Sequence, residues 1–171
     1  VQHREASEFK KDKLKVLAEL TKLRQICCDP RLHYEDYKAG SAKLDTCMEL
    51  VHGALDGGHR ILLFSQFTGM LDIIGKRLAK EDIAFLKLTG ASSKESRAKM
   101  VAQFQAGEVP IFLISLKAGG TGLNLTGASV VIHADPWWNA AAQDQATDRA
   151  HRIGQTHVVS VERVIAKGTI E

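Results

Sequence analysis

The stretch IFLISLKAGGTGLNLTGASVVIHADPWWN, residues 111–139, decides the fold class. It contains two short apolar runs, 111–116 and 130–134, joined by a glycine-rich segment. Their hydrophobicity is continuous rather than alternating, which is typical of strands covered on both faces, as in a parallel sheet. Further runs of the same kind occupy 61–67, 84–88 and 158–165. The sequence therefore predicts a mainly parallel sheet of five strands.

Helices are predicted between several of these strands. One covers residues 69–80 and another covers 140–152, both with apolar side chains at helical spacing. Between them, Ser92 and Glu95 form a capping box, which predicts the start of a further helix. The apolar residues that we expect this helix to bury are Ala98, Val101 and Phe104. Strands and helices in this order predict an α/β three-layer sandwich with a mainly parallel central sheet.

The residues before the first strand form a helical segment. An amphipathic helix is predicted over 10–28, because leucine and isoleucine recur on one side and Pro30 cannot continue a helix. A polar linker, 33–41, leads to Ser41, which is a typical N-cap. The apolar face of the helix that it starts, ended by two glycines, consists of Leu44, Met48, Val51 and Leu55. We expect 1–40 to form a leading helix and linker, and 41–171 to form one lobe.

Composition limits the class of protein. The 171 residues are 44% hydrophobic and 25% charged, which is ordinary for a globular domain and excludes disorder and collagen. No apolar run approaches the roughly 18 residues of a membrane span. The net charge of +3 permits contact with nucleic acid without indicating it. Three cysteines without a C-x-x-C pair, and scattered histidines, predict no metal site and a reducing compartment. The polar first residues without Met and the abrupt end at KGTIE suggest an excised piece of a longer, intracellular protein.

The glycine-rich segment, 117–128, follows a predicted strand, where functional loops of α/β sheets gather. Its small residues let backbone N–H groups approach an oxyanion such as a phosphate. It is not a Walker A loop, because G-x-x-x-x-G-K-[ST] appears nowhere in the chain. Leu125 occupies the third glycine position of a dinucleotide fingerprint, and only about seven residues precede the next strand, too few for a crossover helix. A phosphate contact and a plain turn are equally favoured.

Two further segments carry unusual residues. Gln145, Arg149 and Arg152 share one helix face; the arginines either complement the helix dipole or grip an anion, and the pattern slightly favours the dipole. Both tryptophans lie side by side in 136–139, so one of them is expected to face a partner. His133, within a strand, is interpreted as a core residue rather than a base.

The loop Thr89–Ser93 is the fourth candidate. With Lys94 and Arg97 beside it, it could contact a phosphate backbone, although a capped helix start is the commoner meaning of such a pattern. Ser65-Gln66-Phe67 ends the first strand with polar groups that we expect at the same edge.

The motifs that carry chemistry follow one another in a diagnostic order: FSQFTGML (64–71), LTGASSKESR (88–97), SLKAGGTGLNL (115–125), DPWWN (135–139) and DQATDRAHRIGQ (144–155). They resemble the successive C-terminal motifs of the Swi/Snf-type ATPases of helicase superfamily two. The leading LRQICCDPRL (23–32) resembles the segment that enters this lobe. The resemblance implies a RecA-like second lobe of a two-lobed motor, which binds ATP between its lobes and moves along double-stranded DNA without separating the strands.

The resemblance also implies roles for individual residues. Arg149 and Arg152 match arginine fingers, which stabilise the charge of the reacting phosphates, and Gln145 would orient them. The residues matching segments that bind ATP or couple it to DNA are Gly120, Gly122, Asn124 and Asp148. The residues matching segments along the DNA path are Thr89, Gly90, Lys94, Arg97, Lys117, Thr121, Trp138 and Asn139. Ala140 stands where the family usually has proline, and Thr89 where it often has aspartate.

The first lobe of such motors supplies the Walker A lysine and the acidic motif that holds Mg²⁺, and neither appears in this sequence. We therefore expect ATP and Mg²⁺ to be held mainly by that lobe, and this chain to be inactive alone. Its expected partners are double-stranded DNA, the first lobe of the same polypeptide and DNA-bound proteins, with no membrane. We expect the protein in the cytoplasm or nucleoid if its source is bacterial, and in the nucleus if its source is eukaryotic. A bacterial source is preferred, because no eukaryote-style insertion interrupts the lobe.

Three other functions stay open from the sequence. A Rossmann-like binder of nucleotide or methyl donor is disfavoured by the missing third glycine. A non-catalytic module that only binds DNA or protein is disfavoured by the intact Gln145, Arg149 and Arg152. A strand-separating helicase lobe of the same superfamily is the nearest alternative.

Overall fold

The computed structural model describes residues 2–118, 123, 125–136 and 159–171. Its centre is a sheet in the order β2-β3-β1-β4-β5, and every strand pair is parallel. The strands are β1 (Ile61–Ser65), β2 (Phe85–Leu88), β3 (Ile111–Ser115), β4 (Val130–His133) and β5 (Ser160–Arg163). All five predicted strands are present, each trimmed by one to four residues, and the predicted parallel sheet is confirmed.

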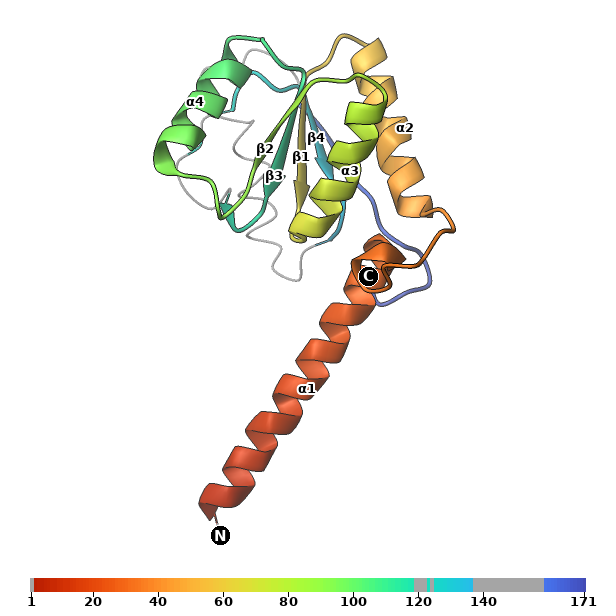
Figure 1. Ribbon diagram of the computed structural model, residues 1–171, viewed down its shortest axis with the longest axis vertical. Coiled ribbons are helices and arrows are strands. Elements are labelled where there is room, and N and C mark those ends of the chain that lie inside the picture. Colours follow the sequence, from red (N-terminus) through yellow and green to blue (C-terminus); the bar gives the residue numbers. More distant parts are fainter. Residues whose placement is uncertain (1, 119–122, 124, 137–158) are drawn as a thin grey trace.

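Helices cover both faces of this sheet (Figure 1). Helices α2 (Ala42–Asp56) and α3 (Thr68–Lys80) lie on one face, and α4 (Lys94–Gln105) lies on the other. Each face has its own apolar core, because successive side chains of a buried strand point to opposite sides: Leu63 packs with α2 and α3, whereas Phe64 packs with α4. The predicted three-layer sandwich is confirmed.

The register brings the loops after β1, β3 and β4 to one edge, and β2 also ends there, with Leu88 paired to Ile114. Ser65 at the end of β1 pairs with Ser115 at the end of β3, and Phe64 pairs with His133 at the end of β4. The carboxyl ends of these strands are therefore level, and the chain leaves the sheet there at each of them. His133 is fully buried and stacks on Phe64 with ring centroids 5.5 Å apart. Its interpretation as a core residue is confirmed.

The start of α4 differs from the prediction. Ser93, not Ser92, is the N-cap, because its hydroxyl accepts a hydrogen bond from the N–H of Ser96 at 3.1 Å. The hydroxyl of Ser92 instead accepts from the N–H of Thr89 and closes the preceding turn. Ala98, predicted to be buried, is exposed and Val101 is half-buried, because Phe104 faces the sheet and six residues at about 100° each place Ala98 about 120° around the helix from it.

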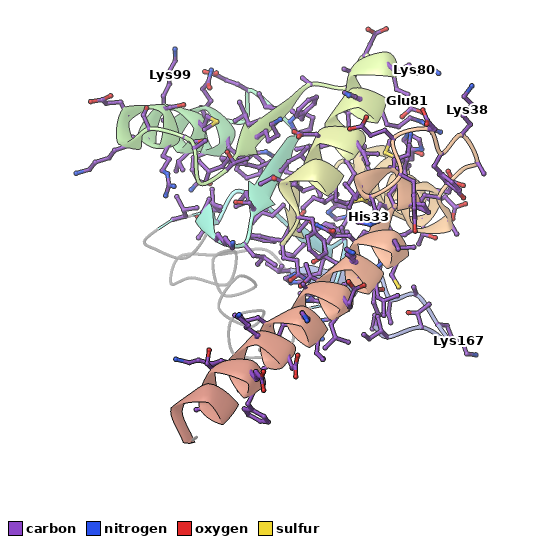
Figure 2. The ribbon with its side chains drawn as sticks, turned by 60° about the horizontal axis from the view of Figure 1, so that its bottom comes forward. His33, Lys38, Lys80, Glu81, Lys99 and Lys167 are labelled. Carbon is purple, nitrogen blue, oxygen red and sulfur yellow. The ribbon has the colours of Figure 1, made fainter. Side chains whose placement is uncertain are left out.

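Helix α1 (Gln2–Cys28) begins eight residues before its predicted start and ends before Pro30, as predicted. It projects from the carboxyl edge of the sheet as a single rod (Figures 1 and 2). Its apolar stripe is largely uncovered: Leu14, Leu17 and Leu23 are between 42% and 64% exposed. A short 3₁₀ helix, η1 (Pro30–Leu32), follows, and Ser41 then caps α2 as predicted. In the described part of the chain, no helix is long and apolar enough to cross a membrane.

Candidate functional site

The carboxyl edge of the sheet has a buried corner where β1 and β4 end. The hydroxyl of Ser65 donates to a carboxylate oxygen of Asp135, and the backbone N–H of Gln66 donates to the other at 3.1 Å. The same hydroxyl accepts from the N–H of Phe67 at 3.1 Å. Ser65 and Asp135 are both almost completely buried. The loops that leave these two strands are therefore tied together below the surface.

The carbonyl of Pro136 extends this corner toward α1. It accepts a hydrogen bond from the side-chain amide of Gln66 at 3.1 Å and a second one from the guanidinium of Arg24 at 3.0 Å. Arg24 belongs to α1, is 9% exposed and lies 5.8 Å from the centroid of the Phe67 ring. Three segments that are remote in the sequence thus meet at one carbonyl.

Burial controls the charge of this corner. It raises the pKa of Asp135, because removal from water disfavours the carboxylate, while hydrogen bonds from Ser65 and Gln66 and the charge of Lys43 oppose this change. Each oxygen of Asp135 has a donor, and the side chain does not reach solvent. Asp135 is thus suited to holding the two loops in place rather than to exchanging protons with a substrate.

The other end of the same edge, where β2 and β3 end, is open. A cavity of about 500 Å³ lies there. The residues that line it are Gln66, Thr68, Asp72, Lys87, Thr89, Gly90, Ala91, Ser115 and Lys117. Lys87 forms an ion pair with Asp72, whereas Gly90 and Lys117 are exposed. Hydroxyls, an exposed lysine and a glycine turn without a side chain suit a phosphate group.

The turn between β2 and α4 holds its own shape. The N–H of Thr89 donates to the hydroxyl of Ser92 at 3.1 Å, and the hydroxyl of Thr89 accepts from the N–H of Ala91 at 3.3 Å. Lys94, the first residue of α4, is exposed beside this turn. Of the predicted DNA-path residues, Thr89, Gly90 and Lys117 therefore line one cavity, and Lys94 follows the turn at the start of α4.

The side chain of Arg97 is directed toward the protein backbone rather than into the cavity. Its guanidinium donates to the carbonyl of Ser92 and to the carbonyl of Ala118, each at 3.3 Å. Ala118 is buried and is the second residue of the glycine-rich segment. The side chain therefore ties the turn after β2 to the loop after β3, and its predicted contact with DNA stays a prediction.

The remaining predicted site residues lie outside the described residues. They are Gly120, Thr121, Gly122, Asn124, Trp138, Asn139, Gln145, Asp148, Arg149 and Arg152. The helix predicted over 140–152 lies outside as well. Within the described ranges, no group of three or more histidine, cysteine, aspartate or glutamate residues could hold a metal ion.

Two polar contacts at the base of the lobe were missed from the sequence. One is Arg24 with Pro136, and the other is the buried ion pair of Lys43 with Glu171, whose nitrogen and oxygen atoms lie 2.5 Å apart. A signal existed for both, because each cation lies four residues before a buried cysteine, Cys28 or Cys47, on the same helix face. The sequence did not show which residues would meet them.

Comparison with known proteins identifies the family. The family described as the helicase conserved C-terminal domain matches residues 42–154. The chain belongs to this family. Its fold aligns with the Sulfolobus solfataricus SWI2/SNF2 ATPase C-terminal domain with a TM-score of 0.78 and 36% identity, over 94% of this chain and 66% of that one. It is therefore a RecA-like lobe of the Swi/Snf type, as its motifs indicate.

Two further proteins similar to this Swi/Snf-type lobe bear on function. One is the Sulfolobus solfataricus SWI2/SNF2 ATPase core in complex with double-stranded DNA, with a TM-score of 0.81 and 40% identity, over 94% of this chain and 34% of that one. The other is the putative ATP-dependent helicase/translocase YwqA of Bacillus subtilis, 43% identical over 91% of this chain and 18% of its own length. The chain spans about a sixth of the length of the curated relatives it matches.

Proposed function

We propose that this chain is the C-terminal motor lobe of a DNA-dependent ATPase that translocates on double-stranded DNA and remodels protein–DNA complexes inside the cell. The observation that carries the proposal is the gathering of Thr89, Gly90 and Lys117 around the cavity at the open end of the sheet edge, with Lys94 exposed at the start of the helix that follows this turn. The likeness to a SWI2/SNF2 core that binds double-stranded DNA supports it. We assign the lobe to 41–171 and the leading helix and linker to 1–40; the start of the family match at residue 42 supports this boundary.

The lobe contributes positive charge to ATP that is held, with Mg²⁺, mainly by the first lobe of the same polypeptide. A planar guanidinium is always charged and matches phosphate geometry, so Arg149 and Arg152 are suited to stabilising the transition state of hydrolysis. Gln145 orients these arginines. The residues that couple nucleotide state to DNA are Gly120, Gly122, Asn124 and Asp148. Since this sequence contains no Walker A motif, the lobe alone does not hydrolyse ATP.

The open end of the edge holds DNA by its phosphates. Lys94 and Lys117 are exposed cations, and the Thr89-Gly90 turn lets backbone approach closely. Contacts of this kind position the duplex without reading its bases, so binding is insensitive to sequence and sensitive to salt. We assign to the same DNA-binding surface Thr121, Trp138 and Asn139. Arg97 holds together the two loops that form this surface.

The proposal is tested by ATP turnover of the two-lobed parent with and without duplex DNA. DNA-stimulated turnover is the expected result, and turnover that ignores DNA would exclude the motor function while leaving the fold intact. A strand-displacement assay on a forked duplex separates translocation from unwinding. Efficient separation of the strands would favour the strand-separating helicase.

A further inference from the structure

We infer that Arg24 is a positioning residue through which helix α1 sets the placement of the chain that follows Pro136. The inference adds a second input, from outside the lobe, to the proposed function, and its turnover measurement rests on that function. It does not follow from the motifs, because Arg24 lies 112 residues before its partner.

The hydrogen bond between Arg24 and the carbonyl of Pro136 is buried and supported by its surroundings. Arg24 is 9% exposed although the neighbouring Leu23 is 49% exposed, so the end of α1 turns its charged side chain inward and an apolar one outward. A buried guanidinium needs acceptors, and the Pro136 carbonyl is one at 3.0 Å. The Phe67 ring, 5.8 Å away, covers its flat face.

Two donors converge on the carbonyl of Pro136. The guanidinium of Arg24 reaches it from α1, and the amide of Gln66 reaches it from the loop after β1 at 3.1 Å. The residue before it, Asp135, is held by Ser65 and by the N–H of Gln66. The sheet fixes one side of this peptide unit and α1 holds the other, so α1 cannot shift without moving the carbonyl or breaking the bond.

The contact matters for function because of the residues that follow Pro136 in the sequence. Trp137 and Trp138 follow Pro136 directly, and the proposed finger Arg149 comes 13 residues later. The carbonyl of Pro136 belongs to the planar peptide unit through which the chain continues, so the hydrogen bonds that hold this carbonyl also orient that unit. At 1.5 Å per residue, α1 is about 40 Å long, so a small tilt of the rod is a large displacement at its far end. Helix α1 thereby acts as a lever on this exit.

The experiment compares Arg24→Ala, Arg24→Lys, Gln66→Ala and the double variant Arg24→Ala/Gln66→Ala with the control Lys22→Ala. Lys22 lies on the same helix, and its ammonium contacts Glu19, an exposed pair. The first readout is the fluorescence emission of the 171-residue chain, whose only two tryptophans follow Pro136. The second is ATP turnover of the two-lobed parent, with and without duplex DNA.

We expect Arg24→Ala to shift the tryptophan emission and to lower DNA-stimulated turnover about tenfold, a loss in keeping with one charged hydrogen bond, with basal turnover changed less. Lysine lacks the planar fork, so Arg24→Lys restores the emission only in part. Because Arg24 and Gln66 share one acceptor, their effects on emission and turnover in the double variant should be non-additive. Lys22→Ala should match the wild type in both readouts.

Unchanged emission and turnover in a folded Arg24→Ala variant would overturn the inference, as would additive effects in the double variant. Circular dichroism reports folding; if Arg24→Ala does not fold, unchanged emission in both Arg24→Lys and Gln66→Ala is the overturning result. The proposed function fails separately, by a wild type whose turnover ignores DNA. The emission test of Arg24 is unaffected by that outcome.

Discussion

The two ends of the carboxyl edge differ sharply, although one sheet makes both. Where β1 and β4 end, Asp135 is 1% exposed and both of its oxygens accept hydrogen bonds from the protein. Where β2 and β3 end, Asp72 is half exposed and pairs with Lys87 beside an open cavity. The first end satisfies its polar groups internally, whereas the second leaves donors facing solvent. The buried corner thus holds the chain in place, whereas the open end is accessible to a ligand.

The difference has a simple origin in the sheet. Strand β1 is central and β5 flanks β4, so the ends of both strands have a neighbouring strand on each side. Strand β2 lies at the edge of the sheet, and its turn has protein on one side only. The chain that leaves the sheet at Asp135 therefore starts from a rigid support, while the turn at Thr89 stays accessible beside the cavity.

The largest effect is expected where the chain continues beyond the buried corner. In the two-lobed parent, Arg149→Ala should lower ATP turnover by about 10³-fold or more, because an arginine finger stabilises charge that develops only in the transition state. Affinity for duplex DNA should stay within about twofold of the wild type. Turnover assays and equilibrium binding to a labelled duplex measure the two quantities. Equal losses of turnover and DNA affinity would contradict the division between the two ends.

The next effect concerns stability. Asp135→Ala should lower the free energy of unfolding by about 3 kcal/mol, because it leaves the buried hydroxyl of Ser65 and the N–H of Gln66 without acceptors. The matched variant Asp72→Ala removes an exposed ion pair and should cost less than about 1 kcal/mol. Urea unfolding of the chain followed by circular dichroism compares them. Similar costs would show that the corners do not differ energetically.

The pH dependence of stability sharpens the same contrast. Since burial raises the pKa of Asp135, the folded chain binds this proton more tightly than the unfolded chain does. Its contribution to stability is therefore complete below the ordinary aspartate pKa of about 3.9 and declines as the pH rises through the raised value. Asp135→Asn should flatten this part of the curve. A slope that persists in Asp135→Asn would place its origin elsewhere.

The smallest effect is expected at the open end. Lys94→Ala and Lys117→Ala should each weaken duplex binding by the parent a few-fold, and each should reduce the slope of log affinity against log salt by about 0.9 if it removes one phosphate contact. Lys99→Ala is the control, because Lys99 is exposed on α4 and points away from the sheet (Figure 2). Basal turnover should not change. A salt slope that Lys99→Ala reduces equally would indicate diffuse attraction rather than two contacts.

Local features of the fold were predictable because their causes lie close together in the chain. The apolar runs of β1, β3 and β4 identified a parallel sheet, and Ser41 was a correct cap because it acts on Leu44, three residues away. The cap of α4 was misplaced by one residue, since Ser92 and Ser93 are adjacent and only the turn geometry selects between them. The spacing of the leucines in α1 predicted an amphipathic helix, but spacing does not show whether another segment covers its apolar side.

By itself, the sequence determined the parallel α/β class, the family and the positions of the motifs, because periodicity and motif order are properties of consecutive residues. Only the tertiary structure decided that Asp135 meets Ser65, 70 residues away, and that Arg24 meets Pro136. It also decided that Arg97 turns toward the carbonyls of its own lobe. The physical reason is that a buried polar group takes whichever partner the strand register and helix packing bring within about 3 Å, and no local pattern encodes that choice.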